Sequence, residues 1–167
     1  LNYSNSRLDG KLPNVFLCDE VGGLPNSYAF EAMRSGQLTI KNKLGFLIST
    51  KYPSIYNPME DEVELAKKIL DGNFEDEETF ALLFEPDDTK DWVNNDDVLF
   101  HANPLAASVP EILQDLLKKR KRAINSPAAR ENFLTKHCNI IYQGKGTEHF
   151  VPIEVVKENE REAIDFS

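Results

Sequence analysis

The sequence predicts an α/β fold in which parallel strands are buried within a sheet. Residues 15–18 and 44–48 are unbroken apolar runs, typical of strands covered on both faces. Between them, residues 28–35 have helical character after a capping Ser27 and before Gly36. The order of strand, helix and strand favours a right-handed crossover between parallel neighbours.

Beyond these strands the chain is predicted to be mainly helical. Apolar residues recur at helical spacing over residues 59–70 and 109–124, and a further helix is predicted over 128–137 after the break at Pro127. Short apolar runs at residues 80–84 and 140–142 predict two more strands.

Composition limits the classes of protein to which this chain can belong. The 167 residues are 41% hydrophobic, which is enough for a folded core. A net charge of -9 argues against a free-standing nucleic-acid binder, although a local basic patch remains compatible with it. Two cysteines, Cys18 and Cys138, cannot form a disulfide scaffold or a cysteine metal site, and they suit a reducing compartment. No apolar run is long enough to span a bilayer, and Trp92 and the phenylalanines are expected in the core.

The first strand is followed directly by two acidic residues, Asp19 and Glu20. ATPases with a phosphate-binding loop have this order in their Walker B element. There the Asp holds the magnesium of the nucleotide through water, and the Glu polarises the attacking water. Two acids at the end of a strand also occur without any such chemistry, so a structural role stays open.

The second strand is followed by Ser49 and Thr50. In these ATPases, a hydroxyl at the end of the neighbouring strand contacts the γ-phosphate or the attacking water and reports hydrolysis to the rest of the protein. The alternative is that the pair only satisfies backbone groups in a turn. The phosphate-binding Gly-x-x-x-x-Gly-Lys-Ser/Thr loop does not occur within the 167 residues.

One basic run interrupts the acidic composition of the chain. It consists of Lys118, Lys119, Arg120, Lys121 and Arg122. Consecutive cations cannot share one helix face, so most of them are expected to be solvated. The alternative is a contact with DNA phosphates or with the nucleotide of a neighbouring subunit.

The remaining polar residues offer weaker candidates for metal binding. The histidines His101, His137 and His149 lack the spacing of metal ligands. Acids between residues 87 and 97 lack the glycine and spacing of a calcium loop, so a solvated loop is expected there. Beside an ATPase, the runner-up hypothesis is a non-catalytic interaction module in which Asp19 and Glu20 are only acids at the end of a strand. A metal-dependent nuclease using Asp87, Asp88 and Asp91 is a third hypothesis.

Longer strings of residues carry more specific information than the Walker B element alone. They are residues 9–13, 17–20, 32–36, 45–50, 56–62, 70–72, 102–104 and 132–139. In this order the strings resemble the large subunits of bacteriophage and prophage terminases across nearly the whole chain. The resemblance implies part of an ATP-driven motor for viral DNA packaging, in which a P-loop ATPase precedes an RNase H-like nuclease.

The resemblance also implies roles for individual residues. Asp19 would be the magnesium-associated acid, Glu20 the catalytic glutamate, and Ser49 and Thr50 the coupling motif. The implied cofactors are ATP and Mg²⁺. The implied partners are double-stranded DNA, the portal protein and the terminase small subunit, with no membrane. The implied location is the cytoplasm of an infected or lysogenic bacterium and, transiently, the procapsid portal.

The resemblance further implies that this chain is a piece of a longer protein. We expect the later part of a P-loop (ASCE-type) ATPase sheet over residues 1–58. Remaining strands and a mainly helical linker subdomain would occupy 59–150, and a charged connector 151–167. The Walker A loop would lie before Leu1 and the nuclease acids after Ser167.

Two consequences follow for the isolated chain. The isolated chain should not hydrolyse ATP and should not bind ATP tightly. The sheet edge left open would pair with another chain or be covered by the chain's own ends.

The residues after the acidic pair often include His in the family but are Val21, Gly22 and Gly23 here. The role of this loop is therefore open.

Overall fold

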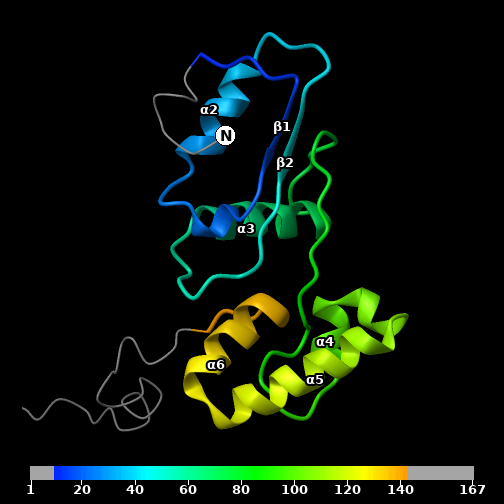
Figure 1. Ribbon diagram of the computed structural model, residues 1–167. Helices are drawn as coiled ribbons and strands as arrows, with labels where there is room; N and C mark the ends of the chain where they lie inside the picture. The colour runs from blue at the N-terminus through cyan, green and yellow to red at the C-terminus, as the bar shows by residue number, and fades with distance from the viewer. Residues whose placement is uncertain (1–9, 143–167) are drawn as a thin grey trace, which may run out of the picture.

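The computed structural model describes residues 10–142 of the chain (Figure 1). The elements in chain order are β1 (Val15–Cys18), the 3-10 turn η1 (Val21–Gly23), α2 (Tyr28–Gly36), β2 (Leu44–Leu47), α3 (Pro58–Leu70), α4 (Asp97–Ala102), the 3-10 turn η2 (Pro104–Ala107), α5 (Pro110–Asn125), α6 (Pro127–Asn132) and the π-helical turn η3 (Phe133–His137).

The two strands form a parallel pair, with Val15 opposite Leu44 and Cys18 opposite Leu47. Helix α2 connects them and lies beside the strands (Figure 1). The predicted α/β class and the strand–helix–strand order are therefore confirmed. Within residues 10–142 the sheet has only these two strands, so a larger P-loop sheet stays a prediction.

One face of the strand pair is buried and the other is open. Phe16 packs with Val21, Phe30 and Met33 in a small core beneath α2. On the opposite face Leu17 is 59% exposed and Phe46, its register neighbour, is 44% exposed. The prediction that both faces of the strands are buried is thus wrong within residues 10–142. The predicted cover by the chain ends concerns residues outside the described range.

Local chemistry fixes the ends of α2 and α3. The predicted cap Ser27 makes no side-chain cap bond, and Asn26 Oδ1 instead accepts from the Tyr28 backbone N–H at 3.1 Å. At α3, Asn57 Oδ1 accepts from Met59 N–H at 3.0 Å. Gly36 is needed for close approach, because a Cβ there would lie 2.1 Å from the Lys11 carbonyl oxygen.

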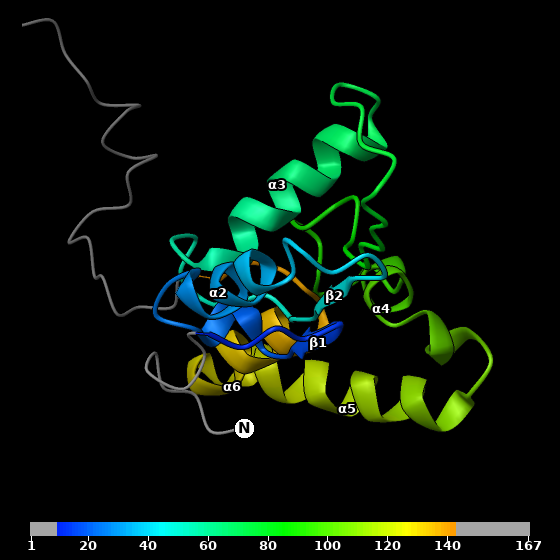
Figure 2. The same cartoon turned by 90° about the horizontal axis from the view of Figure 1, so that it is seen from above.

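A second, larger core belongs to the helical part of the chain. Its buried members come from α4, η2, α5, η3 and the residues that follow, and they are Val98, Leu99, Ala106, Leu116, Ala123, Phe133, Leu134, Cys138 and Ile140. Trp92 packs against them, as expected. Not every phenylalanine is in a core, because Phe80 is 84% exposed. Figure 2 shows α3 and α5 running in different directions from the strand pair.

Two predicted strands are wrong. Residues 80–84 and 140–142 are not strands. The carbonyl of Phe84 accepts from the Asn139 side-chain amide at 2.8 Å. The amide of Ile140 donates to the Leu134 carbonyl at 2.9 Å, which folds it back onto η3.

The predicted helices at 59–70 and 109–124 are confirmed by α3 and α5, each within one residue. The predicted helix at 128–137 is α6 followed by η3. Among the described helices none is long and apolar enough to cross a membrane.

Candidate functional site at the carboxyl ends of the strands

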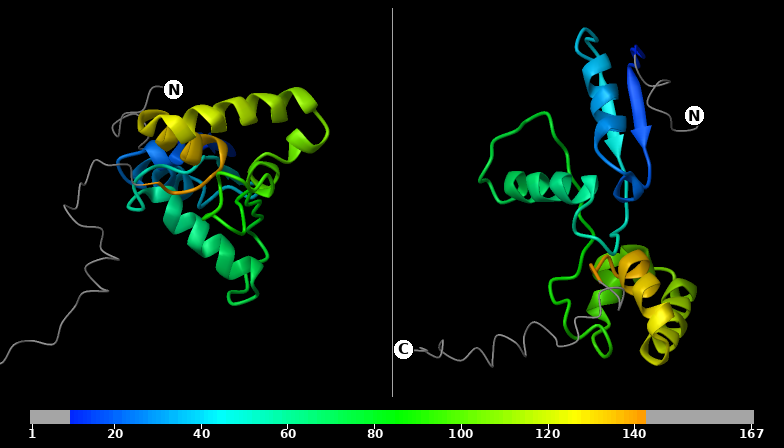
Figure 3. Two further views of the ribbon diagram at one scale, coloured as in Figure 1. Left: turned by 90° about the horizontal axis from the view of Figure 1, so that it is seen from below. Right: turned by 90° about the vertical axis from the view of Figure 1, so that its left-hand side faces the viewer.

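The parallel pairing brings the two predicted polar pairs to one edge of the sheet. Asp19 and Glu20 follow β1, and Ser49 and Thr50 follow β2. The backbone ladder continues past the strands, because Ile48 N–H donates to the Cys18 carbonyl at 2.9 Å. Both strand arrows point toward the helical part of the molecule (Figure 3, right). The carboxyl ends of the two strands therefore face the helical part of the molecule (Figure 3).

Glu20 stands at a sharp change of chain direction. Its backbone is left-handed, with φ 54°, and it leads from β1 into η1. A non-glycine residue in this region is uncommon and costs free energy unless its surroundings stabilise it. Asp19 Oδ1 accepts the Glu20 backbone N–H at 2.8 Å, which stabilises the turn. Both side chains remain exposed to solvent.

The loop after the acidic pair is joined to the hydroxyl pair. Gly22 N–H donates to Ser49 Oγ at 3.0 Å, and Ser49 Oγ donates to the Thr50 carbonyl at 2.8 Å. Tyr52 lies against both glycines. A Cβ at Gly22 would lie 2.5 Å from Tyr52 Cδ2, and one at Gly23 would lie 2.8 Å from the Tyr52 hydroxyl. The two glycines therefore make room for Tyr52.

The Glu20 carboxylate is held by two side chains that the sequence did not single out. The Tyr52 hydroxyl donates to Glu20 Oε2 at 2.6 Å, and Lys136 Nζ donates to the same oxygen at 3.2 Å. Lys136 Nζ also donates to Thr50 Oγ1 at 3.0 Å and lies 3.8 Å from the centroid of the Tyr52 ring. Lys136 belongs to η3, so the helical part reaches both polar pairs with one side chain.

These contacts fix the protonation states at the site. The hydrogen bond from Tyr52, and then that from Lys136, hold the pKa of Glu20 below its usual value. The bond to Glu20 raises the pKa of Tyr52. Burial alone would lower the pKa of Lys136, but its bonds to Tyr52 and Glu20 raise it. At neutral pH the site holds a carboxylate, a neutral phenol and an ammonium group.

Removal of either donor should raise the pKa of Glu20. We expect a rise in both Tyr52→Phe and Lys136→Met, because the Tyr52 bond is the largest single cause of the lowered pKa and Lys136 lowers it through a hydrogen bond and through its charge. A lowered carboxylate pKa stabilises the fold above the unfolded-state pKa, and this stability is lost as pH falls through the folded-state pKa. Both variants should therefore weaken the acid dependence of stability.

The measurement is a pH titration of the Glu20 side-chain carbon by NMR. Tyr56→Phe is a matched control, because Tyr56 is exposed and its hydroxyl is not bonded to Glu20. A Glu20 pKa that stays the same in Tyr52→Phe would contradict the assigned cause.

The segment after the hydroxyl pair is anchored to the rest of the molecule. Lys51 Nζ lies 2.6 Å from Glu60 Oε2, and both side chains are largely buried. The Lys51 backbone N–H donates to Asn139 Oδ1 at 3.3 Å. Asn139 has a left-handed backbone with φ 50°. With Thr50 and Phe84, these residues line a small cavity of about 100 Å³.

Sequence reasoning missed Tyr52, Lys136, Lys51 and Asn139. Lys136 is 116 residues away from Glu20 along the chain. No spacing rule connects such distant residues, because only the packing of η3 against the strand ends brings them together. The one signal available was that Lys136 and Asn139 fall within the family-like string at residues 132–139.

The basic run does not act as a unit. Arg120 donates to Asp96 and to the Asn95 carbonyl, so it joins α5 to the start of α4. Lys119 pairs with Asp115 on its own helix at 3.1 Å. Lys118, Lys121 and Arg122 are exposed, as expected for most of the run.

Metal binding through His, Cys or acid clusters gains no support. Among residues 10–142 no three such side chains are grouped closely enough to hold an ion. This includes Asp87, Asp88 and Asp91, the residues of the nuclease hypothesis. Cys138 is buried, and burial raises its pKa to about 12. His137 beside it is half-buried, and His149 lies outside the described residues.

Comparison with known proteins places this geometry in context. The structure superposes on the crystal structure of the HK97 bacteriophage large terminase with a TM-score of 0.64, at 18% identity. The fold resembles part of a phage large terminase. The match covers 79% of this chain and 26% of the terminase.

A sequence relative is Protein YmfN of Escherichia coli (strain K12), which is 28% identical over 132 residues. These residues are 79% of this chain and 29% of the relative. The chain thus spans less than a third of the length of either protein that it matches. No family model matches the sequence.

Proposed function

We propose that this chain is part of a terminase-like motor that uses ATP hydrolysis to package viral DNA. One observation carries the proposal: Asp19–Glu20 and Ser49–Thr50 follow neighbouring parallel strands and lie at the same edge of the sheet. Ligands of α/β sheets bind at this carboxyl edge. The similarity of the fold to part of a phage large terminase supports the proposal.

The exposed acids suit a magnesium–nucleotide complex. Mg²⁺ keeps several waters and is bound through one or two carboxylates, which agrees with the solvent-exposed position of Asp19. Bound Mg²⁺ would neutralise charge on the phosphates. Asp19 would hold it through water, and Glu20 would orient and polarise the attacking water. The groups that bind the phosphates would come from outside these 167 residues, so the isolated chain is not expected to bind ATP tightly.

Lys136 and Tyr52 act as positioning residues in this proposal. Both donate to Glu20 Oε2, at 2.6 and 3.2 Å respectively. Lys136 also bonds to Thr50, so a shift of η3 would move both the base and the coupling pair. This is a direct physical route by which events at the nucleotide would reach the helical part.

The partners follow from the same proposal. They are double-stranded DNA, a portal protein and a terminase small subunit, with action in the bacterial cytoplasm and, transiently, at the procapsid portal. None of these partners requires a membrane.

Substitution of Asp19 tests the proposal directly. In the full-length protein, Asp19→Asn should raise the Mg²⁺ concentration needed for half-maximal ATP hydrolysis about tenfold, because a carboxylate binds a hard cation better than an amide does. The measurement is steady-state hydrolysis over a magnesium titration. Asp61→Asn on α3 is the matched control, since Asp61 is an exposed acid on a helix and does not follow either strand. An unchanged magnesium dependence would remove Asp19 from this role.

An interaction module without catalysis is the second candidate. The open apolar face of the strand pair favours it, because large exposed apolar patches mark contact surfaces. Its members are Val15, Leu17, Leu44, Phe46 and Ile48. If the full-length protein neither binds nor hydrolyses ATP, this second candidate replaces the first.

A further inference from the structure

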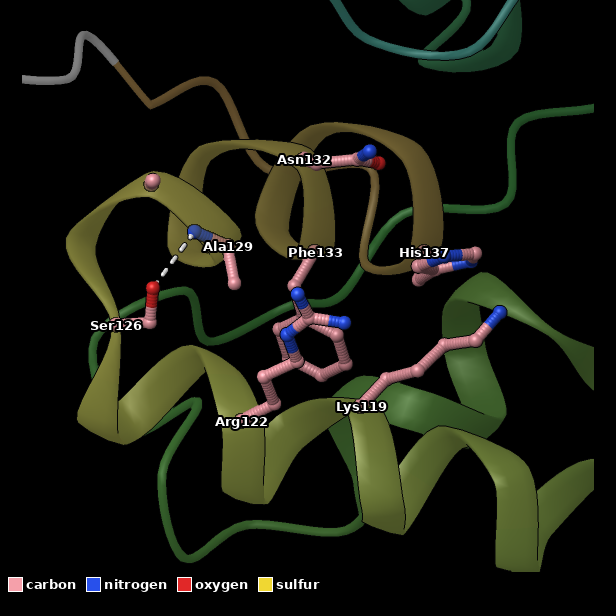
Figure 4. A pocket seen from close by; sticks show the side chains of 8 residues that line it. Lys119, Arg122, Ser126, Ala129, Asn132, Phe133 and His137 are labelled. Atoms are coloured by element: carbon pink, nitrogen blue, oxygen red, sulfur yellow. Dashed lines mark hydrogen bonds between the residues drawn. The ribbon is translucent and has the colours of Figure 1, made fainter.

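A basic pocket lies in the helical part of the molecule, away from the strand ends. Helix α5 contributes Lys119 and Arg122, α6 contributes Asn132, and η3 contributes Phe133 and His137 (Figure 4). The cavity measures about 390 Å³. Phe133 is buried and His137 half-buried, while the two cations and Asn132 are exposed. An apolar floor is thus surrounded by polar donors.

The charge of the lining differs from that of the chain as a whole. The chain has a net charge of -9, yet the residues that line the pocket include two cations and no carboxylate. One of the two cations, Lys119, pairs with Asp115 on its own helix at 3.1 Å. Arg122 makes no ion pair within residues 10–142. One guanidinium is therefore available to a ligand.

The contrast with Arg120 shows that this is not a property of the whole basic run. Arg120 is two residues away and is engaged with Asp96, in a structural role. Arg122 instead faces the pocket beside Phe133 (Figure 4). Two arginines of the same basic run therefore lie in different environments on α5.

We propose that this pocket binds a phosphate group. A guanidinium presents paired donors that match phosphate oxygens, an ammonium adds a point charge, and the Asn132 amide adds a neutral donor. The ligand is either free phosphate or a phosphate of a nucleic-acid backbone. The proposal stands on the pocket alone and does not depend on ATP hydrolysis at the strand ends.

His137 provides a direct readout of occupancy. Burial first, and Lys119 second, hold the pKa of His137 below its usual value, while Asp115 opposes them. Arg122 lines the same pocket from α5, beside Phe133 (Figure 4). A phosphate in the pocket would add negative charge beside the ring and would raise its pKa. The size of this rise follows the occupancy of the pocket.

The experiment is an NMR pH titration of His137 in the full chain, with inorganic phosphate or with acetate at equal ionic strength. Phosphate should raise the His137 pKa, and acetate should not. Arg122→Gln should weaken phosphate binding about tenfold, because a charge-assisted bond is lost. Lys121→Gln, in the same run but not lining the pocket, should leave it unchanged. Equal losses in both variants would overturn the proposal.

A short DNA duplex in place of phosphate distinguishes the two sources. If the duplex raises the His137 pKa at lower concentration than phosphate, the ligand is a nucleic-acid backbone. Loss of Arg122 should then lower the slope of log affinity against log salt by about 0.9, the value of one phosphate contact. A response to phosphate alone assigns the pocket to free phosphate. A response to neither overturns the proposal.

Discussion

Glu20→Gln should slow ATP hydrolysis by the full-length protein about 10²–10⁴-fold, the usual contribution of a general base. The substitution keeps the size of the side chain and its ability to accept a bond from Tyr52. It removes the negative charge that would polarise the attacking water. ATP binding should therefore stay the same, because the roles proposed for Glu20 arise during hydrolysis.

Two measurements separate these effects, namely single-turnover hydrolysis and equilibrium nucleotide binding. Glu64→Gln is the matched control, because it makes the same chemical change at an exposed position of α3. We expect no change in either measurement for this control. Unchanged turnover in Glu20→Gln would show that Glu20 is not the base, whereas loss of binding would indicate a structural role.

Leu99→Ala should lower the free energy of unfolding of the helical part by about 2–5 kcal/mol. Leu99 lies on α4, is 0% exposed and is surrounded by the larger core. Truncation removes apolar contacts and leaves a cavity that rigid neighbouring helices cannot fill.

Urea unfolding followed by tryptophan fluorescence measures this loss. The chain has a single tryptophan, and Trp92 packs against the same core, so its signal reports on this part of the molecule. Leu105→Ala is the control, because Leu105 is 59% exposed and its truncation removes little buried area. A loss below about 1 kcal/mol in Leu99→Ala would contradict the described packing.

The helical core also determines the geometry at the strand ends. Lys136 follows Leu134 in η3, and Leu134 is buried in this core. The position of Lys136 Nζ beside Glu20 and Thr50 thus depends on packing elsewhere in the molecule. Substitutions that disturb η3 should therefore alter the Glu20 pKa even though they lie far from Glu20 in sequence.

The sequence predicted the elements whose signals are local. Residues 15–18 and 44–48 have no polar interruption, and strands were correctly predicted there. The helical spacing at residues 59–70 and 109–124 was equally clear. The predictions failed at residues 80–84 and 140–142, where a short apolar run is compatible with a strand or with a packed, irregular segment.

The same division applies to the candidate site. Asp19, Glu20, Ser49 and Thr50 were singled out from the sequence alone, because their chemistry depends on following two neighbouring strands. Tyr52 was missed because its role depends on the two glycines against which it packs. Lys136 was missed because its Nζ reaches Glu20 only after η3 has folded against the strand ends.

The sequence by itself determined the parallel strand pair, the main helices and the polar groups that follow each strand. Apolar periodicity and turn chemistry are properties of neighbouring residues, so they can be read without the fold. Only the tertiary structure decided how Glu20 is held, which cations of the basic run face a pocket, and which face of the strand pair is covered. These features depend on contacts between distant segments, and such contacts form when helices and strands bury their apolar faces against one another.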